Sequence, residues 1–149
     1  MQHIFLTRNG VYALVFDMSK LVGPLSSDAI RLNALAFMRF WLRQIHLLAK
    51  GAPVVVVGTH KDLVPDAASH VEISNMLDAT FGLGDEAEIW RKCERNEDEE
   101  GGELCFFPVD NSDPSDVNIT RLRRFIERGW KTCFVCGGSY LTLLVTVAC

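Results

Sequence analysis

Two stretches of the chain are nearly continuous runs of apolar residues. Residues 11–16 read Val-Tyr-Ala-Leu-Val-Phe, and residues 53–57 read Pro-Val-Val-Val-Val. Four consecutive valines are too apolar for a strand that has one face in water, and their branched Cβ atoms disfavour a helix. The valine run therefore predicts a strand covered on both faces, as in a parallel sheet, and residues 11–16 predict a second such strand.

A helical pattern separates the two predicted strands. Apolar residues recur at helical spacing over residues 30–48, and the sequence Ser-Ser-Asp at 26–28 is typical of a helix start. Gly51 then ends the helix, and Pro53 opens the valine strand. Strand, long helix and strand form a βαβ crossover, which predicts a parallel sheet. The predicted core face of the helix consists of Ile30, Ala34, Met38, Trp41, Ile45 and Leu48.

The same helix predicts a polar side and an apolar patch outside its core face. Phe40 and Leu47 lie seven positions apart and outside the core arc, so they predict an apolar contact patch. The side opposite the core is basic and consists of Arg39, Arg43, His46 and Lys50.

The second half of the chain predicts two more helices and one more strand. A helix is expected over residues 71–81, ending at Gly82, and a third strand over residues 104–109. Asp116 is typical of a helix cap, and Gly129 of the end of the helix that follows. Together the elements predict an α/β fold with about three parallel strands and helices on the faces of the sheet.

Two segments do not fit this pattern. Residues 85–103 are strongly acidic, with Glu97-Asp98-Glu99-Glu100 followed by two glycines, a composition that suits an exposed or disordered insertion. The tail, residues 132–149, matches none of the predicted elements. Its residues 140–148 are apolar, but they are about half as long as the ~20 residues that a membrane helix needs. The sequence leaves open whether they add a strand, pack on the core or are exposed.

Length and composition limit the class of protein. A chain of 149 residues is long enough for one domain with a sizeable core, and a second full domain is not expected. The formal net charge is −4, so nothing favours a nucleic-acid partner, which usually binds to a basic face. The five cysteines are scattered, and the N-terminus lacks the pattern of a secretory signal. We therefore expect a cytoplasmic protein without a membrane span.

Cys133 and Cys136 have the spacing of a redox pair or of half a zinc site. A redox pair opens a helix near a βαβ unit, whereas these residues follow the predicted last helix. A zinc site needs a second ligand pair at suitable spacing, which the sequence lacks. We expect neither a metal site nor redox activity.

The most chemically informative segment follows the valine strand and reads Thr59-His60-Lys61-Asp62. In open parallel sheets, ligands bind outside the carboxyl ends of the strands, where these residues are predicted to lie. A carboxylate held there can accept hydrogen bonds from both N1–H and N2–H of guanine, whereas adenine offers no such pair of donors. Asp62 is therefore a candidate for guanine recognition; the alternative is that it caps the next helix or turn. Asp17, at the end of the other strand, is expected to serve a turn or cap.

The Thr-His-x-Asp sequence at 59–62 resembles that of Roc (Ras of complex) domains of the ROCO family, where most guanine-specific GTPases carry Asn-Lys-x-Asp. Residues 3–7 and 11–20 resemble the segment after the Asp-x-x-Gly motif and the strand behind it. Residues 106–112 resemble the last strand and the final guanine-contacting loop. The resemblance covers roughly residues 3–131, the C-terminal half of such a domain. It implies a partial Ras-like (P-loop NTPase) sheet whose N-terminal strands are missing.

The resemblance also implies roles for individual residues. Thr59, His60, Lys61 and Asp62 would read the base of GTP or GDP, with His60 in the place of the lysine whose stem usually covers the base. An imidazole can stack there; the alternative is a surface histidine without a role. The backbone N–H groups of the following loop would lie near the guanine carbonyl, and the alternative for them is an ordinary polar turn. That loop consists of Asp110, Asn111 and Ser112.

The chain lacks other parts that a GTPase uses. No Gly-x-x-x-x-Gly-Lys-[Ser/Thr] sequence occurs, so no phosphate cradle and no hydroxyl for magnesium are present, and no catalytic residue can be named. The resemblance thus implies a signalling-related domain fragment that binds guanine nucleotide weakly, does not hydrolyse it alone, and meets magnesium only if the missing half is supplied. Two alternatives remain: a nucleotide-free module that self-associates or binds proteins through Phe40, Leu47 and an unpaired sheet edge, or a fragment without an independent role.

Overall fold

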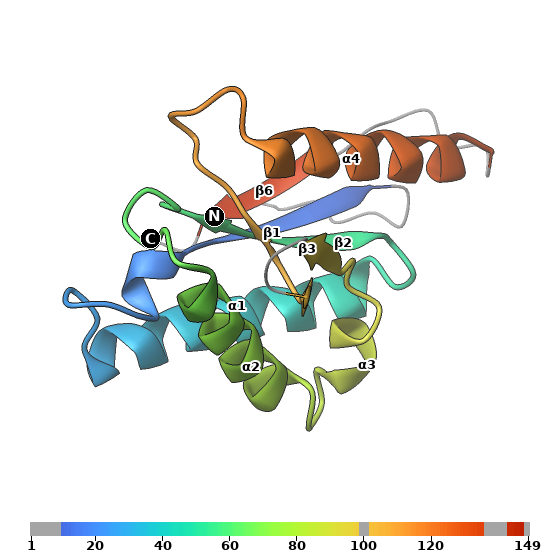
Figure 1. Ribbon diagram of the computed structural model, residues 1–149. Coiled ribbons are helices and arrows are strands. Elements are labelled where there is room, and N and C mark those ends of the chain that lie inside the picture. The colour runs from blue at the N-terminus through green and yellow to red at the C-terminus, as the bar shows by residue number, and fades with distance from the viewer. Residues whose placement is uncertain (1–9, 99–101, 136–142, 148–149) are drawn as a thin grey trace.

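The computed structural model describes residues 10–98, 102–135 and 143–147 (Figure 1). Its centre is a four-stranded sheet in the order β5-β2-β1-β6, in which each neighbouring pair is parallel. The strands are β1 (Val11–Asp17), β2 (Val54–Thr59), β5 (Phe107–Pro108) and β6 (Leu143–Val147). The predicted α/β class, with a parallel sheet flanked by helices, is confirmed. The segment at residues 3–7 that contributes to the family resemblance lies outside the described residues.

Helices cover both faces of the sheet. In Figure 1, α1 (Asp28–Leu48), α2 (Ala67–Phe81) and α3 (Ala87–Trp90) lie on one side, and α4 (Val117–Val135) lies on the other. Because side chains alternate along a strand, β1 contributes to both cores. Its Tyr12, Leu14 and Phe16 belong to the larger cluster with α1 and α2, while Val11, Ala13 and Val15 belong to the smaller one with Phe125 of α4. This two-sided burial explains the uninterrupted apolar runs of β1 and β2.

The predicted long helix is present, and its buried stripe is shorter than expected. Ser27 caps α1 by accepting a hydrogen bond from the Ile30 backbone N–H at 3.3 Å. The buried residues are Ala34, Met38, Leu42 and Ile45. Ile30 and Leu48, which were expected in the core, are 40% and 52% exposed. The 21-residue helix is about 31 Å long and β1 about 23 Å, so the helix is longer than the strand on which it packs.

In the part of the acidic segment that the structure describes, residues 85–96 pack against the core and are not the exposed insertion that the composition predicted. Trp90 of α3 is buried, packs on Phe81 with ring centroids 5.0 Å apart, and donates from Nε1 to Asp78 at 2.7 Å. The buried Glu86 carboxylate forms ion pairs with Arg39 and Arg43 of α1. The basic side of α1 therefore contacts this segment. Composition failed here because it does not show that the buried side chains of Glu86, Ile89 and Trp90 anchor the segment to the core.

The segment that precedes the final loop is also arranged differently from the prediction. A 3-residue strand β3 (Asn96–Asp98) pairs antiparallel with β4 (Gly102–Leu104), outside the main sheet. The strand expected over 104–109 is therefore only the two residues of β5, because Leu104 belongs to the separate ribbon.

The C-terminal part of the chain adds structure that the sequence left open. Helix α4 continues through Gly129 to Val135, so the predicted stop at Gly129 is wrong. Cys133 consequently lies within the helix and not after it, while Cys136 is outside the described residues. Beyond that gap, β6 pairs with β1 from Val11 to Val15 and occupies the edge of β1 that was expected to be unpaired. None of the described helices is long and apolar enough to cross a membrane.

Candidate ligand site at the carboxyl ends of the strands

The carboxyl ends of β2 and β5 bring the two predicted guanine-reading segments together. Thr59 ends β2 and residues 60–62 follow it, while residues 110–112 follow β5, which is its parallel neighbour. The two segments are hydrogen-bonded to each other, because Val109 N–H donates to the Gly58 carbonyl at 2.8 Å and Lys61 N–H donates to the Val109 carbonyl at 3.3 Å. The predicted juxtaposition is therefore present in the structure.

Gly58 keeps the turn close to the core beneath it. A Cβ atom at this position would lie 2.7 Å from the Met18 side chain and 2.9 Å from the Phe106 ring. Any larger residue would therefore push the chain outward just before Thr59. The close approach of this backbone to its neighbours explains why glycine interrupts an otherwise β-branched strand.

On one side of the turn, Thr59 and His60 form a small network with β1. The Thr59 hydroxyl donates to the Phe16 carbonyl at 3.1 Å, which ties β2 to β1. The hydroxyl has a single proton, which it donates to Phe16. In its 3.2 Å contact with His60 Nδ1 the hydroxyl therefore accepts, and Nδ1 carries the proton. The same nitrogen lies 3.3 Å from Asp17 Oδ1. The His60 side chain is half-exposed, on a backbone with φ of 62°.

Asp17 has the turn role that the sequence predicted. Its carboxylate accepts hydrogen bonds from the backbone N–H of Ser19 at 2.9 Å and from the Ser19 hydroxyl at 2.6 Å. These bonds cap the short 3₁₀ helix Met18–Lys20. The ion-pair geometry with His60 is an addition that spacing along the chain did not reveal.

On the other side of the turn, Lys61 reaches into a polar cluster around Asp116. The ammonium lies 3.4 Å from Asp116 Oδ1, and the Asp116 side chain is only 4% exposed. That carboxylate also accepts from the backbone N–H groups of Asp110 at 2.8 Å and Asn118 at 2.9 Å. Asp116 therefore caps α4 as predicted. It also links all three segments of the site, a role that the sequence analysis missed.

Asp62 has no structural partner. Its side chain is exposed, and within the described residues no hydrogen bond or ion pair involves its carboxylate. The cap of α2 is Asp66 instead, which accepts from the Ser69 backbone N–H at 2.8 Å. The alternative in which Asp62 caps the next helix is therefore wrong. Its carboxylate remains available to an external donor.

The loop after β5 uses most of its polar groups internally. The Asp110 carboxylate accepts from both the hydroxyl and the backbone N–H of Ser112, which lowers the pKa of Asp110. The polar-turn interpretation is thus correct for these two residues. Of the three backbone N–H groups that were expected to face guanine, those of Asp110 and Ser112 already donate within the protein. Only the N–H of Asn111 has no partner among the described residues.

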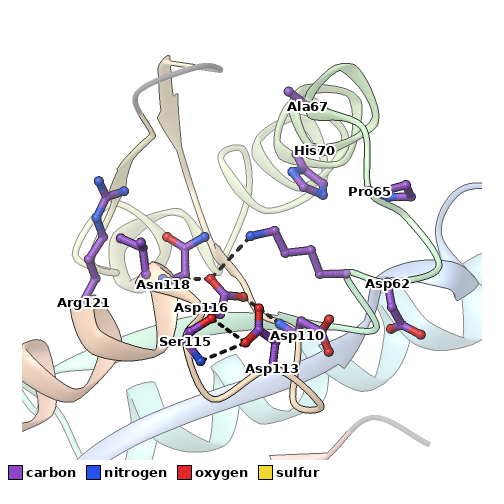
Figure 2. Close-up of a pocket in the computed structure, with 12 residues that line it drawn as sticks. Asp62, Pro65, Ala67, His70, Asp110, Asp113, Ser115, Asp116, Asn118 and Arg121 are labelled. Carbon is purple, nitrogen blue, oxygen red and sulfur yellow. Dashed lines mark hydrogen bonds and ion pairs between the residues drawn. The ribbon is translucent and has the colours of Figure 1, made fainter.

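A cavity of about 600 Å³ lies beside this edge of the sheet, between the first turns of α2 and α4 (Figure 2). Three of the predicted site residues line it, namely Lys61, Asp62 and Asp110, whereas Thr59, His60, Asn111 and Ser112 do not. Four aspartates and two basic residues line the cavity, so their formal charge is −2 with histidine neutral. The lining consists of Lys61, Asp62, Pro65, Ala67, His70, Asp110, Asp113, Ser115, Asp116, Val117, Asn118 and Arg121.

The described part of the chain offers no metal site. It contains no group of three or more His, Cys, Asp or Glu side chains placed to hold an ion. Burial raises the pKa of Cys93 and of Cys105 to about 12, so both thiols stay protonated and are poor metal ligands or nucleophiles.

Comparison with protein-family models found no matching family, and comparisons with curated proteins and with solved structures found no match either. The chain is therefore characterised by its α/β fold and by the geometry of this site.

Proposed function

We propose that this chain is a Roc-type, GTPase-like fragment whose sheet edge recognises the guanine base. The observation that carries the proposal is the unpartnered Asp62 carboxylate at the end of the buried strand β2. An exposed aspartate beside a tight turn usually accepts a backbone N–H, as Asp66 and Asp110 do nearby. Asp62 does not, so both of its oxygens are available to N1–H and N2–H of guanine.

The neighbouring loop supports the same assignment. The free N–H of Asn111 is a donor for the guanine carbonyl, and the backbone bond from Lys61 to Val109 holds the two loops together. The half-exposed ring of His60, held by Asp17 and Thr59, supplies a surface on which a base can stack. The Thr-His-x-Asp sequence and its spacing to the last loop are the further support from the chain itself.

The charges around the site indicate how such a ligand would be bound. Among the described residues, the cavity lining is net negative and Lys61 is paired with Asp116, so this lining does not favour the phosphates of a nucleotide. In GTPases, phosphate and magnesium contacts supply much of the affinity. We therefore propose weak binding through the base alone, in which guanosine binds at least as well as GDP or GTP and magnesium adds nothing, without hydrolysis.

A titration series tests this proposal. The purified chain is titrated with guanosine, GMP, GDP and GTP, with adenosine as the competitor that lacks the donor pair. We expect saturable binding of guanosine that adenosine does not displace and that Asp62→Ala removes. The matched control is Asp113→Ala, which removes the same charge from the same cavity but leaves Asp62 intact, and it should bind like wild type. No guanosine binding by the folded chain would contradict the proposal.

A second candidate function is a protein-interaction module. The observation that favours it is the exposure of large apolar side chains on α1, where Phe40 is 53% and Leu47 is 72% exposed. Exposed apolar surface of this kind is typical of contact sites. Asp62→Ala separates the two candidates, because it should abolish guanine binding and leave any contact through α1 unchanged.

A further inference from the structure

The outward face of α1 carries a regular stripe that the guanine site does not use. Residues 30, 33, 37, 40, 44 and 47 follow alternating steps of three and four, the spacing of helices that pair along a seam. The buried stripe of α1, at residues 34, 38, 42 and 45, lies on a different side of the helix. Ile30, Phe40 and Leu47 of this stripe are exposed by 40% or more, whereas Phe37 is partly buried and also packs against the larger core cluster.

The order of residues along this stripe is symmetric. About the midpoint between residues 38 and 39, Phe37 is related to Phe40, residue 33 to residue 44, and Ile30 to Leu47. The related positions match in chemistry: two aromatic residues at the centre, two side-chain amides next, and two branched aliphatic residues at the ends. In a two-fold symmetric interface, residue i of one copy contacts j of the other, and j contacts i. A sequence with this symmetry is complementary to its own antiparallel copy.

We propose that the partner of this face is a second copy of the same chain, with the two α1 helices packed antiparallel. The layers of the contact are Phe37 against Phe40 of the other copy, Asn33 against Gln44, and Ile30 against Leu47. This proposal specifies the partner in the second candidate function and so rests on it. It does not depend on guanine binding.

The amide layers favour a second copy over an unrelated apolar partner. Asn33 is exposed and Gln44 is half-buried, on either side of the aromatic centre. An apolar helix laid on this stripe would cover both amides without offering them hydrogen bonds, which is unfavourable. In the symmetric pair, each amide meets another amide that both donates and accepts. A polar layer in an apolar seam also fixes its register.

The length of the contact indicates its strength. The stripe runs most of the length of α1, about 31 Å, and involves one helix from each copy. A single helix pair of this length lies at the lower end of the size range of specific interfaces, about 1,200 Å² in total. We expect a reversible dimer with a dissociation constant of about micromolar order.

Analytical ultracentrifugation of the full chain over a range of concentrations tests for the dimer. Phe40→Glu places a carboxylate against the opposing Phe37 and should raise the dissociation constant about tenfold or more. The matched control is Leu32→Glu, because Leu32 is also on α1 and even more exposed, at 66%, but lies outside the stripe. It should change dimerisation by less than about twofold. Far-ultraviolet circular dichroism verifies that both variants are folded.

Paired charges test the antiparallel register. The double variant Asn33→Glu/Gln44→Lys places opposite charges across both amide layers of an antiparallel dimer, so it should dimerise more tightly than wild type at low salt. Asn33→Glu/Gln44→Glu places like charges there and should be monomeric. In a parallel dimer, each of these residues would meet its own copy, so both double variants would repel.

Three outcomes would overturn the proposal. One is a wild-type chain that remains monomeric throughout the micromolar range. Another is a dimer that Phe40→Glu leaves intact. The third is a dimer that Asn33→Glu/Gln44→Lys weakens. If the chain is monomeric but the exposed α1 face still binds a different protein, the second candidate function holds and self-association does not. Guanosine titration of the same samples reports separately on the base site.

Discussion

At the scale of single residues, Asp62 is the position where the proposed function makes its sharpest prediction. A carboxylate accepts two hydrogen bonds, whereas an asparagine amide accepts one and donates one. Xanthine carries an oxygen where guanine carries its N2 amino group, so it presents one donor and one acceptor on that edge. Asp62→Asn should therefore weaken guanosine binding and strengthen xanthosine binding, changing their ratio by about ten- to hundredfold. Competition titration with the two nucleosides measures this ratio.

The control for this exchange is Asp113→Asn. Asp113 lines the same cavity, but its carboxylate accepts from the backbone N–H and the hydroxyl of Ser115. The substitution removes the same charge without altering the proposed base contact, so wild-type selectivity should persist. An Asp62→Asn chain that prefers guanosine as strongly as wild type would show that Asp62 does not read the base.

Asp116 makes a second residue-scale prediction, about stability. Its nearly buried carboxylate caps α4, holds the Asp110 backbone N–H and pairs with Lys61. Asp116→Ala should lower the free energy of unfolding by about 2 kcal/mol or more, because it removes a helix cap and leaves buried donors unpaired. Asp113→Ala, which removes a more exposed aspartate of the same loop, should lower the free energy of unfolding much less. Urea unfolding measures both, and equal effects would contradict the role of Asp116.

The residue scale also shows what the sequence can and cannot predict about the site. The position of Asp62 follows from one local fact, a polar turn after a strand that is apolar on both faces. The Asp110 carboxylate bonds to Ser112 two positions later, as a polar turn predicts. Asp116 bonds to the nearby Asn118 and Asp110, but it also pairs with Lys61 from another segment, and that role depends on the fold. Lys61 and Asp116, for example, are 55 positions apart in the chain. Spacing along the sequence does not predict that contact.

At the scale of elements, the correct predictions rest on local patterns of apolar residues, and the features that were missed depend on contacts between segments. Both β1 and β2 were predictable because burial on both faces leaves a continuous apolar run. The packed segment around α3 was not, because its burial depends on Trp90 reaching Phe81 and Asp78 in α2. The end of α4 was missed because a glycine within a helix costs only about 1 kcal/mol relative to alanine, which neighbouring contacts can offset.

The contact between α2 and the acidic segment leads to a prediction about how stability depends on pH. Burial of Asp78 opposes ionisation, but hydrogen bonds from Arg95 and Trp90 outweigh it and lower the pKa of Asp78. A carboxyl with a lowered folded-state pKa contributes stability above its unfolded value of 3.8, and that contribution is lost as the pH falls through the folded value. Wild type should therefore be more stable than Asp78→Asn at pH 6, and the difference should shrink as the pH falls below about 4.

Thermal unfolding of the two proteins from pH 6 to pH 3 measures this difference. Asp66→Asn is a useful comparison, because the pKa of Asp66 is also lowered, but by bonds to Ser69 at an exposed helix cap. Asp66→Asn should reduce stability at pH 6 without affecting the packing of Trp90. The tryptophan fluorescence of Asp66→Asn should therefore match that of wild type, whereas that of Asp78→Asn should differ. A difference between wild type and Asp78→Asn that does not depend on pH would rule out the ionised Asp78 as the source of stability at this contact.

At the scale of the whole molecule, the C-terminal strand decides whether the sheet is complete. Strand β6 pairs with β1 along five positions, and β1, like β2, supplies side chains to both cores. Removing residues 136–149 would leave the hydrogen-bonding groups of that edge unpaired in a strand that is buried on both faces. Domains of this size are stable by only about 5–15 kcal/mol in total, so the loss of one edge strand is a large fraction.

We therefore expect the chain truncated after Val135 to unfold at a lower urea concentration than the full chain, and to aggregate, because an unpaired apolar edge is a template for pairing with other chains. The matched control is a full-length chain with Thr146→Pro, which retains the composition of the tail but removes one backbone donor from β6 and should give a smaller effect in the same direction. Equilibrium unfolding and light scattering measure both. A truncated chain as stable and monodisperse as the full one would mean that β1 does not need β6. The sheet would then be held by β1, β2 and β5 together with the helices on its two faces.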